Sequence, residues 1–243
     1  HVVLLHPFPL DNRVWEPVVN QLHGVEVLTP NFLGCAGRQV PSESPDLAVL
    51  ARDVIEQIDA AGISNFILGG ISLGGYVAME LLRQTPDRID GVIFADTKCT
   101  ADSDESKANR ERIAKQMTNR GQLELLAENM VTTLLGKTTH KKNPALVEQV
   151  KGWIVQANPN AVAWLSRAMA NRAESAQTLI DFEKPALLIH GEEDNVSTSE
   201  DFDQMQELLL HVIRVEISGS GHLPPVEQTE KTALAINSWL TQF

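Results

Sequence analysis

Short apolar runs alternate with longer amphipathic segments along most of this chain, and this alternation constrains its fold more than any other feature. The apolar runs predict strands over residues 2–6, 25–29, 65–69, 89–95, 186–190 and 212–217. Apolar residues spaced by three and four predict helices over residues 14–22, 46–61, 73–84, 199–210 and 225–240. Strands that alternate with helices form a parallel sheet covered on both faces. The sequence therefore predicts an α/β fold with a mostly parallel sheet.

The alternation stops between residues 101 and 181, where only helical patterns occur. They cover residues 106–117, 122–135, 144–156 and 160–171. An all-helical block between two strands is best interpreted as an insertion over one end of the sheet. Ligands of open α/β sheets bind at the carboxyl ends of the strands, so an insertion there would roof a site. We predict a core formed by residues 1–100 and 182–243, with a helical cap formed by residues 101–181.

The composition and charge of the chain limit the kinds of partner that it can bind. The formal net charge of −12 argues against nucleic acid or an anionic membrane as partner, because both require a basic surface. Cys35 and Cys99 have neither metal-ligand spacing nor a disulfide pattern, which fits a reducing compartment. There is no signal-peptide pattern, and no apolar stretch approaches the roughly 18 residues of a membrane span. We expect a cytoplasmic protein, and the sequence leaves open both its oligomeric state and whether residues precede His1.

A glycine-rich turn between the predicted strand 65–69 and helix 73–84 carries the pattern G-x-S-x-G, formed by Gly70, Ser72 and Gly74. A strand that turns into a helix this sharply holds the serine in a strained conformation with its hydroxyl exposed. Side chains two residues before and after the serine would collide across the turn, so both positions need glycine. The context predicts a nucleophilic serine, Ser72.

A serine hydroxyl needs a base that is held by a third group. Among the seven histidines, His222 lies in a loop after the last predicted strand, at the same sheet edge as Ser72. The acid should follow another strand, and Asp194 is the last of three carboxylates after strand 186–190. The other two, Glu192 and Glu193, are expected to face solvent. Asp96, which follows strand 89–95, is the alternative acid.

With these motifs the chain resembles the α/β-hydrolase fold superfamily over nearly its whole length. That family orders its triad as serine, acid and histidine, which corresponds here to Ser72, Asp194 and His222. In detail the chain is similar to small carboxylesterases, enol-lactonases and cofactor-free haloperoxidases. The stretch His6-Pro7-Phe8-Pro9-Leu10 also resembles the oxyanion segment of that group.

The resemblance implies where an oxyanion would be held. Attack on a carbonyl places negative charge on its oxygen, which preorganised N–H groups must meet. The family takes one donor from the residue after the serine and one from the first strand–helix loop, here the amides of Leu73 and Phe8. Proline has no N–H, so Phe8 carries the one amide hydrogen between Pro7 and Pro9.

The resemblance implies a serine hydrolase that cleaves a small-molecule carboxylic ester or lactone through an acyl-enzyme, with no metal or organic cofactor. The same triad could serve a perhydrolase or haloperoxidase, a thioesterase or a C–C hydrolase, and a non-catalytic small-ligand binder is a further alternative. The candidate lining of an apolar substrate pocket is Met130, Trp153, Trp164, Met169 and Leu223.

Overall fold

The computed structural model describes residues 1–117 and 121–243, which form an α/β fold around one sheet. Six strands lie in the order β2-β1-β3-β4-β5-β6, and every neighbouring pair is parallel. They are β1 (Val2–Leu5), β2 (Val27–Leu28), β3 (Phe66–Ile71), β4 (Ile89–Ala95), β5 (Ala186–Gly191) and β6 (Val212–Ile217). The predicted parallel sheet is confirmed.

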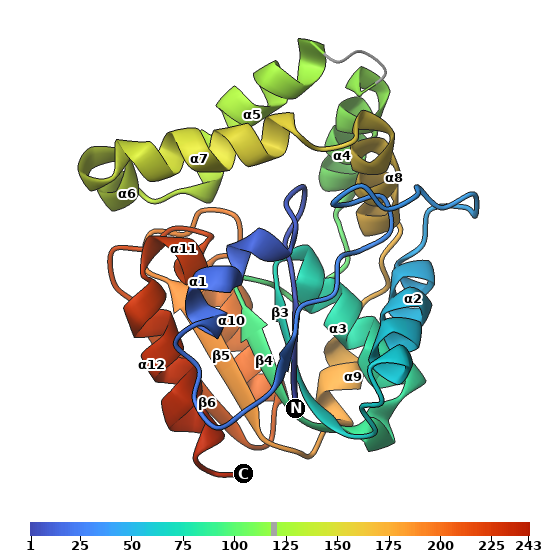
Figure 1. The fold of residues 1–243 in the computed structure, drawn as a ribbon. Coiled ribbons are helices and arrows are strands. Elements are labelled where there is room, and N and C mark those ends of the chain that lie inside the picture. Colours follow the sequence, from blue (N-terminus) through green and yellow to red (C-terminus); the bar gives the residue numbers. More distant parts are fainter. Residues whose placement is uncertain (118–120) are drawn as a thin grey trace.

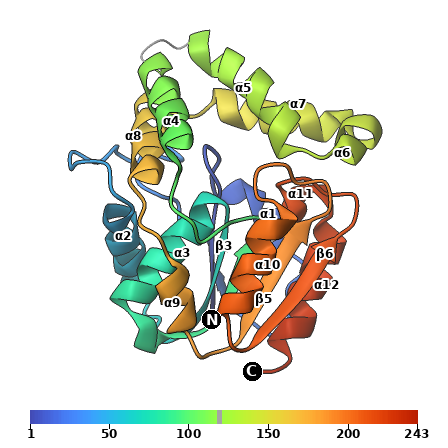
Figure 2. The same cartoon turned by 180° about the vertical axis from the view of Figure 1, so that it is seen from behind.

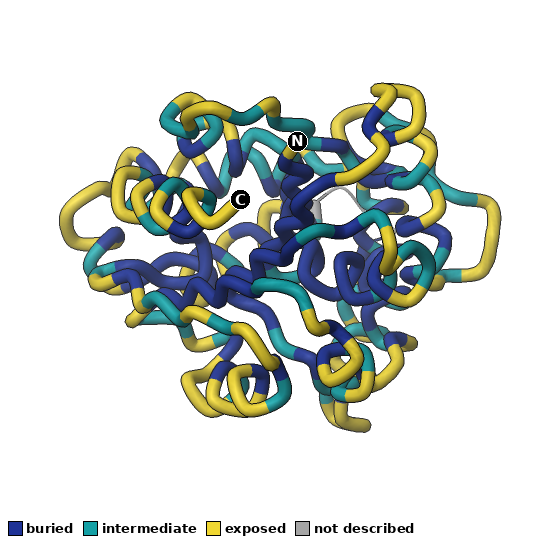
Figure 3. Tube along the Cα trace, turned by 90° about the horizontal axis from the view of Figure 1, so that it is seen from below, coloured by how far each residue is buried: buried dark blue, intermediate teal, exposed yellow. Residues whose placement is uncertain are grey.

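Helices cover both faces of the sheet (Figures 1 and 2). One layer contains α1 (Glu16–Val19), α11 (Pro224–Glu227) and α12 (Thr229–Leu240). The other contains α2 (Leu47–Ala60), α3 (Leu73–Gln84), α9 (Ala176–Ile180) and α10 (Ser199–Leu208). Seen from below, the buried strands run through the middle of the molecule and the exposed segments lie around its rim (Figure 3). All residues of β1 and β3 are buried, as two covered faces require.

The segment between β4 and β5 begins with helices that lie over the carboxyl ends of the strands (Figure 1). They are α4 (Asp104–Gln116), α5 (Gly121–Leu134), α6 (Lys137–Lys142), α7 (Pro144–Val155) and α8 (Pro159–Ala170). Helix α4 packs against α8, and α5 and α6 pack against α7. We call α4–α8 the upper helices. The division into core and cap stays a prediction, and α9, which it counts with the cap, contacts α3 and α10.

The helices carry apolar residues on the side that faces the sheet. In α2, for example, Leu50, Val54 and Ile58 are fully buried, and Asp46 caps the first turn by accepting a hydrogen bond from the amide of Ala48 at 2.9 Å. In the described part of the chain, no helix has both the length and the apolar character that crossing a bilayer requires.

Two predicted helices differ from the observed ones, and helix α6 is observed without having been predicted, each for a local reason. The helix expected over 14–22 is a 3₁₀ turn followed by the short α1, with Pro17 in the first α-helical turn, where its missing N–H costs no bond. The helix expected over 225–240 divides at Gln228, whose φ of −138° is not helical. Helix α6 was not predicted, because its sequence Lys-Thr-Thr-His-Lys-Lys has no apolar period.

Candidate active site

Ser72 occupies a strained turn between β3 and α3. Its φ of +54° lies in the left-handed region that side chains with a Cβ rarely adopt. A Cβ at Gly70 would overlap the backbone of Gly74, and a Cβ at Gly74 would overlap the carbonyl oxygen of Leu5. The two glycines of the motif are therefore required by close backbone approach. Although Ser72 stands at the N-cap of α3, its hydroxyl caps no amide there and remains available.

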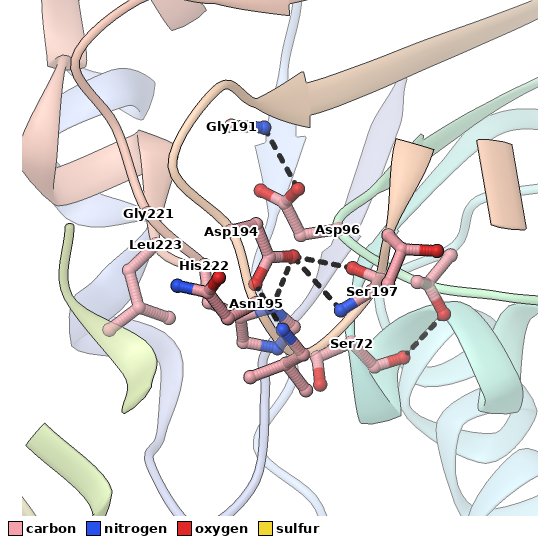
Figure 4. Close-up of polar contacts among 12 residues, drawn as sticks. Ser72, Asp96, Gly191, Asp194, Asn195, Ser197, Gly221, His222 and Leu223 are labelled. Atoms are coloured by element: carbon pink, nitrogen blue, oxygen red, sulfur yellow. Dashed lines mark hydrogen bonds and ion pairs between the residues drawn. The ribbon is translucent and has the colours of Figure 1, made fainter. Parts of the chain in front are cut away.

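His222 and Asp194 form a buried pair at the same edge of the sheet (Figure 4). The Nδ1 atom of His222 lies 2.8 Å from Asp194 Oδ2, and both side chains are almost fully excluded from solvent. Within residues 1–117 and 121–243, the Nε2 atom of His222 is buried and has no hydrogen-bond partner. In a neutral imidazole, a proton on Nδ1 leaves a lone pair on Nε2 that can accept a proton.

The Asp194 carboxylate is surrounded by donors. Burial by itself would raise the pKa of Asp194, but the charge of His222 and the hydrogen bonds from His222, Ser197 and Val196 outweigh burial. The pKa therefore lies well below its ordinary value. The Ser197 hydroxyl donates at 2.5 Å and the Val196 amide at 2.8 Å. Asp194 is thus a fixed negative charge that orients the imidazole of His222.

Ser72 and His222 line one cavity of about 310 Å³ beneath the upper helices. The remaining lining residues are Phe8, Tyr76, Lys98, Asp102, Ser106, Asn109, Arg110, Ile113, Met130, Thr133, Leu134, Met169 and Val196. The structure thus brings the predicted serine, histidine and acid to one place from three distant loops. The space suits a small molecule.

Of the two predicted oxyanion donors, Phe8 lines the cavity and Leu73 directly follows Ser72 in the chain. Phe8 lies in a turn closed by a bond from the Leu10 amide to the Pro7 carbonyl at 3.1 Å. In the part of the chain that the structure describes, neither the amide of Phe8 nor that of Leu73 donates a hydrogen bond to the protein. Two unused amides beside a strained serine fit an oxyanion hole.

His6 holds the loop that carries Phe8. The ring is fully buried, its Nδ1 lies 3.1 Å from the Pro7 carbonyl, and its Nε2 accepts a hydrogen bond from the Phe32 amide at 3.1 Å. Burial lowers the pKa of His6 to about 4. A neutral ring with its proton on Nδ1 satisfies both bonds, so His6 acts as a polar spacer and not as a base.

The structure places the residues of the predicted apolar lining in different parts of the molecule. Met130 and Met169 do line the cavity next to Ser72. Trp153 instead lines a separate groove, where Arg13 lies over its ring, and Trp164 donates its indole N–H to the Glu43 carbonyl at 2.9 Å. Leu223 is fully buried in the core and does not line the cavity. The helical period shows that such residues are buried, but not which cavity they face.

The cavity lining also contains charged residues, which the sequence analysis did not place there. The Asp102 carboxylate pairs with Arg110 and with Arg172, each at 2.6 Å. Arg172 in turn lies over the ring of Tyr76, 4.2 Å from its centre. Lys98 lines the same cavity. These residues come from separate elements, and only the tertiary fold brings them together.

These features and their arrangement place the protein in a known class: the chain belongs to the α/β hydrolase fold family, whose model matches residues 1–229. The solved structures similar to it include a thermophilic esterase from Thermogutta terrifontis with malate bound. That esterase is 33% identical, with a TM-score of 0.95 over 99% of this chain and 89% of the esterase chain.

Two enol-lactonases are more distant relatives. The 3-oxoadipate enol-lactonase 1 of Acinetobacter baylyi is 26% identical over 95% of this chain and 84% of its own length. The enol-lactonase of Burkholderia xenovorans LB400 shares the fold at 21% identity, with a TM-score of 0.89 over 99% of this chain and 90% of the lactonase. The predicted resemblance to hydrolases of this kind is confirmed.

Proposed function

We propose that this protein is a serine hydrolase that cleaves a small carboxylic ester or lactone through an acyl-enzyme. One observation carries the proposal. His222 is held by Asp194 through Nδ1, its Nε2 is unpartnered in the described structure, and Ser72 lines the same cavity. A serine and an imidazole that line one cavity, with a carboxylate bonded to the imidazole, are the parts of a nucleophilic triad.

In the first half of the reaction, His222 Nε2 takes the proton of the Ser72 hydroxyl while Ser72 Oγ bonds to the substrate carbonyl carbon. The amides of Phe8 and Leu73 donate to the oxygen that becomes negative. His222 then gives its proton to the leaving oxygen as the carbon–oxygen bond breaks. In the second half, His222 takes a proton from water, the hydroxide attacks the acyl group, and Ser72 is released with its proton restored.

The lining of the cavity supports a short acyl group that carries a polar substituent. Ile113, Met130 and Met169 offer apolar surface, whereas Lys98 and Arg110 offer hydrogen-bond donors. Both cations have acidic partners, since Arg110 pairs with Asp102 and Lys98 lies 3.7 Å from Asp201. The similarity to a thermophilic esterase and to enol-lactonases agrees with ester or lactone chemistry.

Turnover of a small panel tests the proposal: p-nitrophenyl esters of increasing acyl length, an aliphatic lactone and an acyl thioester. We expect esters of short acids or the lactone to be hydrolysed fastest. The variant Ser72→Ala should lower kcat by at least roughly a thousandfold, because it removes the nucleophile. The matched control is Ser238→Ala, since Ser238 is an exposed serine on α12, and it should keep full activity.

The outcomes separate the proposal from its alternatives. Turnover confined to the thioester, or peroxide-dependent activity without ester cleavage, would assign the triad to another chemistry. Equal activity in the wild type and Ser72→Ala would rule out Ser72 as the nucleophile.

A further inference from the structure

A second buried aspartate adjoins the triad and has no role in the mechanism above. Asp96 directly follows β4 and is fully excluded from solvent. Its φ of +37° lies in the left-handed region, so the backbone is strained at this residue. The Asp96 amide donates to the Ile189 carbonyl at 3.0 Å, which anchors the turn to β5.

The two carboxyl oxygens of Asp96 differ in their surroundings. Oδ1 accepts a hydrogen bond from the Gly191 amide at 2.9 Å. Oδ2 is buried and has no partner in the described part of the chain. A buried carboxylate oxygen without a donor is costly, and Asp194 is already a negative charge close by. An ionised Asp96 would therefore be both unsatisfied and repelled.

The charges around Asp96 favour its protonated form. Ligand atoms of Asp96, His190 and Asp194 lie within 4.8 Å of one another, and Figure 4 shows the Asp96 side chain between Gly191 and Asp194. Glu227 adds a more distant negative charge. Burial lowers the pKa of His190, so this ring adds no positive charge that would pair with Asp96. A proton on Oδ2 of Asp96 removes the repulsion and gives that oxygen a bond to make.

We propose that Asp96 is a neutral carboxylic acid that donates its proton in a hydrogen bond to Asp194, and that it thereby positions the acid of the triad. Asp194 is the acceptor of the pair because it already receives bonds from His222, Ser197 and Val196. Asp96 then satisfies both of its own oxygens, with Oδ1 accepting from Gly191 and Oδ2–H donating. It links the end of β4 to the loop that carries Asp194, and it touches no substrate atom.

The charge distribution agrees with this assignment. Burial and the charge of Asp194 raise the pKa of Asp96 well above its ordinary value, and the bond from Gly191 only partly opposes them. The role assigned to Asp96 rests on the proposed serine hydrolase function. Its protonation state does not depend on that function and is measured separately.

Infrared spectroscopy tests the protonation state. At pH 7 the wild type should show the C=O stretch of a protonated carboxylic acid, which shifts in D₂O and is absent in Asp96→Asn. The matched control, Asp87→Asn, replaces an exposed aspartate and should keep the band. If the spectra of the wild type and Asp96→Asn do not differ in this region, Asp96 is ionised or holds a cation, and the proposal is overturned.

Kinetics tests the positioning role. Asparagine can accept from Gly191 and donate to Asp194, so Asp96→Asn should keep kcat within about threefold and the same acid limb of the pH profile. Asp96→Val removes the donor and should lower kcat by about 10- to 100-fold with KM little changed. Thermal unfolding of each variant shows whether it is folded.

Two kinetic results would contradict the role proposed for Asp96. Asp96→Asn as slow as Asp96→Val, or with a shifted acid limb, would mean that the enzyme needs a charge at this position. Full activity in Asp96→Val would remove the positioning role. A wild type without ester turnover would instead contradict the proposed function, and the infrared result would still stand.

Discussion

Among single residues, His6 and His222 show that a buried histidine can have either a structural or a chemical role, depending on its hydrogen bonds. His222 has a carboxylate partner and a ring nitrogen that is unbonded in the described structure, whereas both nitrogens of His6 are used within the protein. The ring of His6 also packs against Phe32, with 4.3 Å between the ring centres. The sequence distinguished them by position alone, because His6 ends a strand and His222 lies in a flexible loop after one.

The buried His6 should make stability depend on pH. The unfolded chain takes up a proton at this histidine as the pH falls through 6.5. In the folded state, burial lowers the pKa of His6 to about 4, so protonation requires a lower pH. The stabilisation is therefore complete above pH 6.5 and is lost between pH 6.5 and 4, by up to about 3 kcal/mol. His190, whose pKa burial also lowers, adds to the same loss.

Urea unfolding at pH 7 and pH 4.5 measures this loss in the wild type and in His6→Gln. Glutamine does not titrate, so the variant should lose less stability on acidification, although its stability at pH 7 is lower. The exposed His211→Gln is the control and should behave as the wild type. An equal loss in His6→Gln and the wild type would contradict the neutral, buried state of His6.

At the scale of elements, the strand–turn–helix unit formed by β3 and α3 is where sequence and structure agree most closely. The predicted helix 73–84 has the bounds of α3, because its apolar period is unbroken and Pro86 stops it. Helices α7 and α8 match their predictions to within one residue for the same reason. Helices α6 and α9 have one turn or two and no apolar stripe, so periodicity could not find them.

The close packing at this turn can be tested by substituting Gly74, with Gly152 in α7 as a control. Gly74→Ala would push a methyl group into the Leu5 carbonyl, so we expect a loss of unfolding free energy of about 2 kcal/mol or more. Gly152→Ala is the matched control, because a Cβ at Gly152 in α7 would meet open space. It should stabilise the protein by roughly 0.5–1 kcal/mol. Equal stability of the two variants in urea would contradict the close approach of α3 to β1.

At the scale of the whole molecule, the upper helices are tied directly to the loop that carries His222. The His222 amide donates to the Leu134 carbonyl at 2.9 Å, and Glu227 accepts from the Gly136 amide at 2.8 Å and from the Leu223 amide at 3.0 Å. The placement of the candidate site is thus shared between the sheet edge and the helices above it.

Hydrogen bonds between residues far apart in the sequence are difficult to predict from the sequence alone. Glu193 was expected to face solvent, but its carboxylate is half-buried and binds the amide and the hydroxyl of Thr138 at 2.8 and 2.6 Å. An acid in a polar loop looks the same in sequence whether it is solvated or bonded to a distant helix. The meeting of Ser72, Asp194 and His222 was predictable because strand ends must meet at one sheet edge, whereas the cavity lining depends on how helices pack.

The proposed function requires Ser72 as the nucleophile and His222 as the base that activates it. Mass spectrometry of the intact protein and its peptides after reaction with a fluorophosphonate tests both roles. We expect one adduct per chain, located on Ser72, absent in Ser72→Ala and formed far more slowly in His222→Ala. An adduct on another residue of the folded wild type, or none at all, would contradict it.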